Sequence, residues 1–208
     1  MNFKEFYLDE DDYRMDHKAP SKEDAPMHNL EGTYPEDIYS GNALRLYGHG
    51  DPMNIESISI IQSAKNRPRK LIKIYRAVPN LNYDIEKEMK PWVDAYNYFI
   101  KWKFTPMENK TSLYKNKEYN EIYDKYFDYS DGGEKWKEAM LSKIQEFKDK
   151  MIPPIKINSG DWVTINKRYA IEHGITNLNN RFKIITKTVP ASTLYTDGNS
   201  IHEWGYNE

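Results

Sequence analysis

The hydrophobic pattern of this chain changes its period twice, and this constrains the fold more than any other feature of the sequence. Residues 71–78 are β-branched and aromatic and alternate apolar with polar side chains, and residues 181–189 form a second β-branched run, as in half-buried strands. Between them, residues 83–151 carry apolar side chains three and four positions apart, the spacing of amphipathic helices. Strands on both sides of a helical middle predict an α+β fold with a largely antiparallel sheet.

Shorter elements flank these segments. Residues 55–65 repeat isoleucine at helical spacing, and Pro68 disfavours helical geometry just beyond them. Residues 160–165 read as a strand followed at once by a short helix over 166–174, which we expect to end at its glycine. A last strand is expected within residues 200–206. The helical middle should contain two or three helices, broken near Thr105-Pro106 and near Asp131-Gly132-Gly133.

The first forty residues differ in charge from the rest of the chain. Residues 1–40 hold 11 acidic and 4 basic side chains and three prolines, without a sustained helical or strand period. The remainder holds 21 acidic and 26 basic side chains, since the whole chain has 32 and 30. A length of 208 residues indicates one domain with an appended segment. We therefore expect a flexible acidic arm over residues 1–40 and a folded domain over residues 41–208.

Composition excludes several kinds of chemistry. The chain has no cysteine, which removes disulfides, thiolate nucleophiles and Cys-ligated metals. Its five histidines show no metal-binding spacing such as His-Glu-x-x-His, so we expect no metal site. No apolar run approaches the roughly 20 residues of a membrane span, and the N-terminus lacks the basic and apolar stretches of a secretory signal. These features predict a cytoplasmic protein without a membrane partner.

Arg76 lies on the apolar side of the first predicted strand. It shares a face with Ile72 and Ile74, because side chains alternate along a strand. A buried guanidinium is costly unless an anion meets it. Either an internal carboxylate forms a structural ion pair with Arg76, or an anionic ligand binds there.

Three segments in a fixed order resemble the motifs of a known enzyme superfamily. They are Ile74-Tyr75-Arg76-Ala77-Val78, then Trp162-Val163-Thr164 with Tyr169-Ala170 on the following helix, then His202-Glu203-Trp204. In this order they resemble the Arg, Ser/Thr and Glu motifs of the ADP-ribosyltransferase superfamily, and in particular its phage-associated members. The resemblance covers residues 44–208. It implies a fold of split β-sheets with NAD bound in the cleft, and a helical segment between the first two motif strands.

The resemblance also implies roles for individual residues. Glu203 would bind the 2′-hydroxyl of the nicotinamide ribose and stabilise the positive charge that develops when nicotinamide leaves. Arg76 would hold a phosphate or ribose oxygen with its planar fork. Thr164 would support the ribose and orient Glu203. Tyr169 either stacks on the nicotinamide ring or belongs to the core. The implied catalytic residues are Glu203, Arg76 and Thr164, and the implied NAD-binding residues are Arg76, Tyr75, Ala77, Thr164, Tyr169 and Glu203.

Two departures from the family pattern leave the reaction open. Val163 and Ile165 flank Thr164 where many members have serine, and Ile201 stands where arginine-directed members have a second glutamate. The resemblance implies a mono-ADP-ribosyltransferase, a toxin-like phage effector that modifies a protein or nucleic acid in the host-cell cytoplasm. One alternative is an NAD glycohydrolase that uses the same site. Another is a non-catalytic binding or inhibitor protein that retains the fold. A lone histidine such as His202 is more often a hydrogen-bonded structural residue than a ligand.

Overall fold

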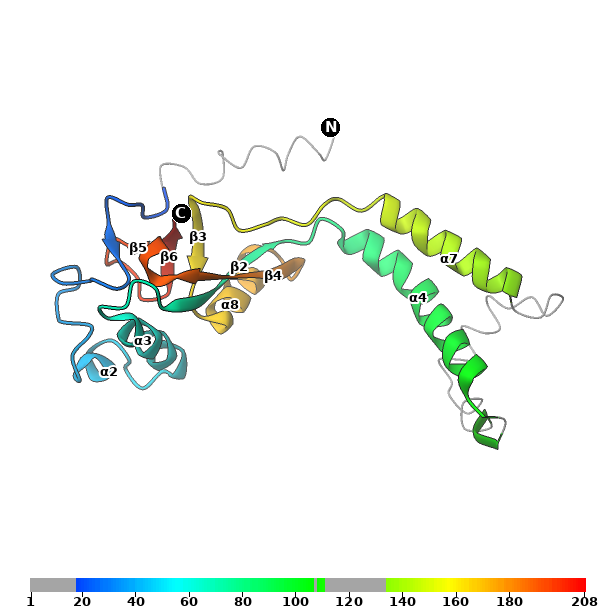
Figure 1. Ribbon diagram of the computed structural model, residues 1–208, viewed down its shortest axis with the longest axis horizontal. Coiled ribbons are helices and arrows are strands. Elements are labelled where there is room, and N and C mark those ends of the chain that lie inside the picture. Colours follow the sequence, from blue (N-terminus) through cyan, green and yellow to red (C-terminus); the bar gives the residue numbers. More distant parts are fainter. Residues whose placement is uncertain (1–17, 107, 111–133) are drawn as a thin grey trace. The chain divides into compact units, whose positions relative to one another are not determined.

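A computed structural model describes residues 18–106, 108–110 and 134–208 (Figure 1). The chain forms two compact units. The first comprises residues 18–79 together with Ile155–Glu208, and the second comprises the described residues of Asn80–Pro154. The helical middle predicted from the sequence is therefore a unit of its own, inserted between two halves of the sheet-containing unit.

The first unit is built on one six-stranded sheet in the order β1-β5-β6-β3-β2-β4. Every paired strand is antiparallel, which confirms the predicted α+β class. The strands are β1 (Ala25–Pro26), β2 (Leu71–Pro79), β3 (Asp161–Thr164), β4 (Phe182–Pro190), β5 (Leu194–Thr196) and β6 (Glu203–Tyr206).

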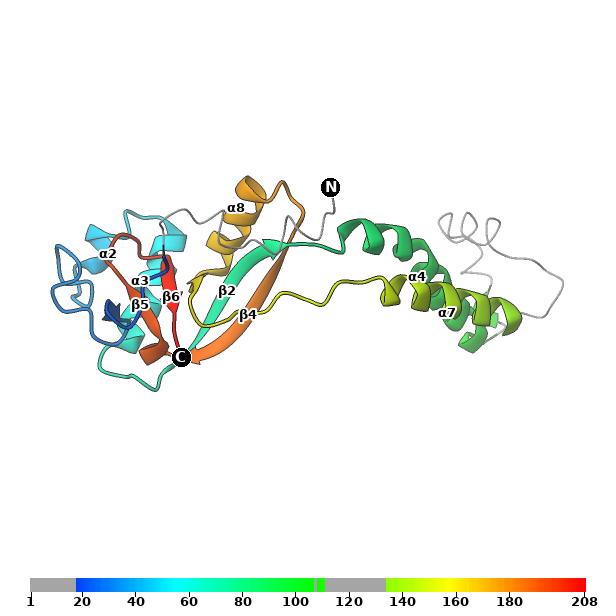
Figure 2. The same ribbon diagram turned by 90° about the horizontal axis from the view of Figure 1, so that it is seen from above.

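The sheet is almost divided between β2 and β3. Strands β2 and β4 pair along their whole length, from Leu71 with Pro190 to Pro79 with Phe182, and lie side by side in both views (Figures 1 and 2). Strands β2 and β3, in contrast, share one pair, Tyr75 with Thr164. The β2–β4 ribbon and the β3–β6–β5 strands therefore meet at a narrow junction of one residue pair.

The described part of this unit contains three helices: α2 (Ala43–Leu46), α3 (Pro52–Ala64) and α8 (Lys167–Asn177). Local signals start two of them, because Asp51 caps α3 ahead of Pro52 and Asn166 caps α8. In α3, Ile58 and Ile61 are fully buried, whereas Ile55 is 37% exposed and lies off the buried face. A short 3₁₀ turn, η2, spans Ala191–Thr193.

Helix α8 does not end at Gly174, as the sequence pattern suggested, but continues to Asn177. A Cβ atom on Gly174 would lie 2.4 Å from the Phe182 ring of β4. This glycine therefore serves the close packing of α8 against β4, and not a helix terminus.

Residues 18–40 also differ from the expected flexible arm. Met27, Leu30 and Ile38 belong to the main hydrophobic core, where each is at most 3% exposed. The sequence did not reveal these buried residues, because isolated apolar residues in a polar, proline-rich loop show neither helical nor strand periodicity. Residues 1–17 of the predicted arm lie outside the described residues.

The second unit contains α4 (Tyr83–Phe104) and α7 (Glu134–Asp149), which pack together in both views (Figures 1 and 2). Their contact is built on Ala95, Phe99 and Met140. Helix α4 ends at the predicted break before Pro106, whereas the break expected at residues 131–133 lies outside the described residues. Within the described part of the chain, no helix combines the length and apolar character needed to cross a membrane.

Candidate functional site

The three strands predicted to carry the site are neighbours in the sheet. Tyr75 of β2 pairs with Thr164 of β3, and Thr164 pairs with Glu203 of β6. Directly opposite residues of antiparallel strands project to the same face. Tyr75, Thr164 and Glu203 therefore form a row on one face of the sheet, although 89 and 39 positions separate them along the chain. Ala77 shares this face with Tyr75.

Arg76 lies on the opposite face. Its Nη1 atom is 2.6 Å from Oδ2 of Asp161, and the two side chains are 18% and 7% exposed. Of the two alternatives for this arginine, the structure contains the internal ion pair. The predicted grouping of Arg76 with Thr164 and Glu203 is therefore not formed, because alternation along β2 turns adjacent side chains to opposite faces.

Thr164 is 4% exposed, and its hydroxyl is used locally. The Oγ1 atom accepts a hydrogen bond from the backbone N–H of Asn166 at 3.1 Å, which closes the turn between β3 and α8. Within the described residues no bond links this hydroxyl to Glu203. Thr164 thus shapes the turn into α8 and does not orient Glu203, which was its expected role.

Asn166 joins two helix starts and was not predicted as a site residue. Its side-chain oxygen accepts from the N–H groups of Arg168 and Tyr169. Its Nδ2 donates to the Met53 carbonyl at 3.2 Å and to the Glu56 carboxylate at 3.0 Å. The fully buried Asn166 therefore fixes the first turn of α8 to the first turns of α3. Its only sequence signal was an asparagine immediately before a helix.

Tyr169 supplies the contact to Glu203. Burial, followed by the hydrogen bond to Glu203 and the negative charge of that carboxylate, raises the pKa of the Tyr169 phenol well above its usual value of 10. The phenol therefore stays protonated and donates to Glu203. One face of the Tyr169 ring is stacked on His202, with ring centroids 4.9 Å apart and planes inclined by 21°. The face that stacks on His202 is therefore closed to a ligand.

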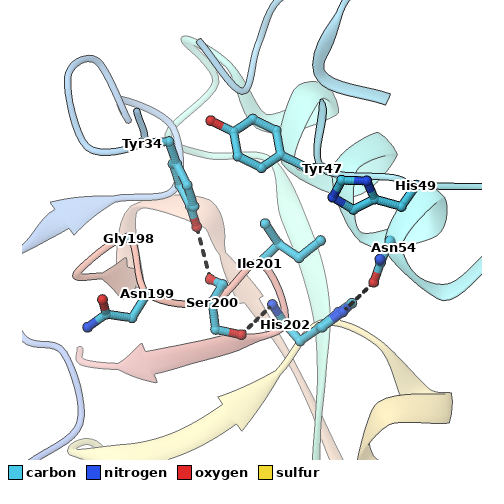
Figure 3. Close-up of a pocket in the computed structure, with 9 residues that line it drawn as sticks. All are labelled: Tyr34, Tyr47, His49, Asn54, Gly198, Asn199, Ser200, Ile201 and His202. Atoms are coloured by element: carbon cyan, nitrogen blue, oxygen red, sulfur yellow. Dashed lines mark hydrogen bonds between the residues drawn. The ribbon is translucent and has the colours of Figure 1, made fainter. Parts of the chain in front are cut away.

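His202 precedes Glu203 and points toward α3. Its Nδ1 atom is 2.9 Å from Ser57 Oγ. Its Nε2 atom is 2.8 Å from Asn54 Oδ1 (Figure 3). Burial lowers the pKa of His202, and the nearby carboxylates of Asp51, Glu203 and Glu172 offset only part of this effect. His202 is therefore a neutral, hydrogen-bonded residue. Among the described residues, His202 included, no three or more His, Asp or Glu side chains group so that they could hold a metal ion.

An open pocket of about 350 Å³ adjoins this network (Figure 3). The rings of Tyr34 and Tyr47 meet edge to face in it, with centroids 5.7 Å apart. His49 and the loop 198–202, which includes Ile201, complete its wall. Its lining residues are Tyr34, Tyr47, His49, Asn54, Gly198, Asn199, Ser200, Ile201 and His202, none of which is an acid, a lysine or an arginine.

Hydrogen bonds hold the loop before Glu203. The backbone N–H groups of His202 and Glu203 both donate to Ser200 Oγ, at 3.1 and 3.2 Å. The Ser200 carbonyl accepts from the Tyr34 hydroxyl at 2.9 Å (Figure 3). These contacts fix the start of β6, and with it the position of the Glu203 backbone.

Comparisons with protein-family models, with curated proteins and with solved structures give no match for this chain. What the site can do follows from its own geometry. It presents the Glu203 carboxylate, held by a protonated phenol on a sheet face, next to a pocket without charged lining residues. Such an arrangement can stabilise a developing positive charge or accept a proton.

Proposed function

We propose that this protein cleaves NAD between nicotinamide and ribose and transfers the ADP-ribosyl group to an acceptor, with Glu203 as the catalytic carboxylate. The observation that carries the proposal is the row of Tyr75, Thr164 and Glu203 across three adjacent strands. These residues come from the three segments whose order resembles the ADP-ribosyltransferase motifs. The hydrogen bond from Tyr169 gives the carboxylate a defined orientation.

The chemistry requires one negative charge at the ribose. When the bond between C1′ and the nicotinamide nitrogen breaks, nicotinamide departs as a neutral ring with the bonding electron pair. The ribose then carries positive charge, which the Glu203 carboxylate stabilises. The acceptor forms the new bond to C1′ and releases its proton to Glu203 or to water.

The expected cleft between split sheets is in keeping with the narrow β2–β3 junction, where a single residue pair joins the two parts of the sheet. In this proposal NAD lies beside the partly exposed Tyr75, Ala77 and Glu203, at the border of α8, which packs on the same face through Gly174 and Phe182. Thr164 lies beneath them and is 4% exposed. Arg76 is occupied by Asp161 on the other face. The cation that β2 offers on the NAD-binding face is Lys73, which is exposed and lies over the Tyr75 ring.

Hydrolysis of NAD is the second candidate. Ile201 and the rest of the adjoining pocket lining provide no acidic side chain to orient a basic acceptor such as arginine. Water would then take the place of the acceptor, and free ADP-ribose would be the product. A protein or nucleic-acid acceptor in the host cytoplasm remains the first candidate, since it matches the resemblance of the motifs.

The test uses the full chain with NAD labelled in its adenylate part, both alone and with a cell lysate. Nicotinamide release and label on macromolecules are measured for the wild type, Glu203→Gln and Glu138→Gln. Glu138→Gln is the control, because it makes the same charge change at an exposed position of α7, in the other unit. We expect Glu203→Gln to lower release about 10²-fold or more and Glu138→Gln to keep it.

The outcomes separate the candidates. Label on a macromolecule supports transfer, whereas stoichiometric free ADP-ribose supports hydrolysis. If calorimetry detects no NAD binding and the wild type releases no nicotinamide, the proposal is wrong and a non-catalytic binding role replaces it. Equal activity in the Glu203 and Glu138 variants would also overturn it.

A further inference from the structure

We infer that His202 is a positioning residue of this site: its ring, fixed by Ser57 and Asn54 of α3, holds the Tyr169 ring so that the phenol reaches Glu203. The inference rests on the proposed role of Glu203 and adds the device that orients this carboxylate. Its basis is a continuous chain of contacts that runs from α3 through His202 and Tyr169 to Glu203.

The hydrogen bonds select one tautomer of His202. Asn54 Nδ2 donates to the Gly48 carbonyl at 3.4 Å, so turning the amide over would bring two oxygen atoms together there. Asn54 Oδ1 therefore faces His202 Nε2, and this nitrogen must carry the hydrogen that Oδ1 accepts. Nδ1 is then unprotonated and accepts from the Ser57 hydroxyl. Both ring nitrogens are thus held, and the imidazole plane cannot rotate freely.

A fixed imidazole plane determines the position of its stacking partner. The Tyr169 ring lies nearly parallel to the imidazole. Tyr169 belongs to the first turn of α8, which Asn166 anchors to the same part of α3. Glu203 is the next residue after His202, with its backbone N–H on Ser200 Oγ. The His202 imidazole thus orients the Tyr169 phenol, while the backbone at the start of β6 places the Glu203 carboxylate to which the phenol donates. A displacement of about 1 Å at such a contact can cost up to ~10²-fold in rate.

The charge state of His202 matters for this role. The groups that face it are Ser57, Asn54 and Asp51 from the α3 region, Tyr169 and Glu172 from α8, and Glu203 from β6. Protonation would place a hydrogen on Nδ1 and force the Ser57 hydroxyl to reverse its bond. The positioning role therefore belongs to the neutral ring, and activity should fall on the acid side as this ring becomes charged.

The first experiment needs no variant. In ¹⁵N-labelled full-length protein at pH 7, NMR should show His202 with Nε2 protonated and Nδ1 unprotonated. A charged ring, or a hydrogen on Nδ1, would overturn the inference, because Nδ1 would then donate to Ser57 and not accept from it.

The second experiment compares His202→Ala, His202→Phe and the control His173→Ala, whose side chain is exposed on α8. In each variant the Tyr169 phenol is titrated by NMR of ¹³C-labelled tyrosine, with Tyr169→Phe identifying its signal. We expect the Tyr169 pKa to fall toward 10 in His202→Ala, to fall less in His202→Phe, which keeps a ring for stacking, and to stay unchanged in His173→Ala. An unchanged Tyr169 pKa in folded His202→Ala contradicts the inference.

NAD cleavage gives the third readout and separates the two proposals. His202→Ala should lower kcat tenfold to a hundredfold while KM for NAD changes less, since no bound atom of NAD needs to contact His202. If His202→Ala keeps the wild-type kcat, the positioning role is wrong although Glu203 still acts. If the wild type cleaves no NAD but the Tyr169 pKa shifts as expected, the proposed function fails and the positioning contact stands.

Discussion

Arg76 and Asp161 form a 2.6 Å ion pair on the face of the sheet opposite Glu203. Asp161 also accepts from the Asn158 backbone N–H at 2.8 Å, so this carboxylate ties β2 and the turn before β3 together. Arg76 therefore has a structural task that does not require a ligand.

Replacing Arg76 tests this assignment. Arg76→Met should leave the buried Asp161 carboxylate without its cation and lower the free energy of unfolding. Breaking a buried pair costs roughly 3–5 kcal/mol, and less is expected here because Arg76 is 18% exposed. Arg76→Lys should lose less, since it keeps the charge. Urea denaturation measures both changes. A folded Arg76→Met protein of wild-type stability that no longer binds NAD would instead return Arg76 to the NAD site.

The stability of the fold should depend strongly on the side-chain amide of Asn166. Asn166→Ala removes the cap of α8, which costs about 1–2 kcal/mol, and also the buried amide bonds to Met53 and Glu56. Asn166→Asp keeps the cap acceptor but sets a second carboxylate against Glu56. Its stability deficit should shrink as acid neutralises one of the two carboxylates, whereas that of Asn166→Ala should not. Thermal unfolding at pH 7 and pH 4 distinguishes these results.

Gly205 should not tolerate a larger residue. A Cβ atom there would lie 1.7 Å from the Pro20 carbonyl oxygen, so Gly205→Ala must displace the chain that crosses β6. We expect a loss of about 1–3 kcal/mol, the usual range for overpacking, and faster trypsin cleavage at Lys22. Gly41→Ala is the matched control, because nothing lies within 4 Å of its added Cβ. Equal stability of the two variants would show that the segment near Pro20 is not held against β6.

Tyr34 should make the fold sensitive to alkali. Burial raises its pKa to about 12 from the usual 10. The unfolded chain therefore loses the phenol proton at lower pH than the folded chain, and the stability from this group, full below about pH 10, is lost as pH rises toward 12. Tyr34→Phe should lose about 1 kcal/mol at pH 7 with the bond to the Ser200 carbonyl. Its stability should then fall less steeply above pH 10, which denaturant titrations at several pH values can measure.

Local patterns were enough to predict several elements. Ile72 and Ile74 share the buried face of β2, as their alternation indicated. The helix after Thr164 forms where predicted, because Asn166 satisfies the first N–H groups of α8 without help from distant residues. The strands that carry Arg76, Thr164 and Glu203 were also recognised in order.

Long-range packing decided the rest. A sequence contains no direct record of strand register, so the alignment of Tyr75, Thr164 and Glu203 and the separation of Arg76 from them emerged only in the folded sheet. The same holds for Gly174, which looked like a helix end until Phe182 packed against it.

The sequence by itself determined the longer strands and helices and which of them carry a carboxylate, a hydroxyl and a phenol, because these properties depend on near neighbours along the chain. The short elements β1, α2 and β5 had no such local signal. Only the tertiary structure decided that Tyr169 and His202 hold Glu203 while Thr164 does not. The physical reason is that hydrogen bonds and ring contacts form between atoms within a few ångströms, and β3, α8 and β6 bring these residues together across the fold.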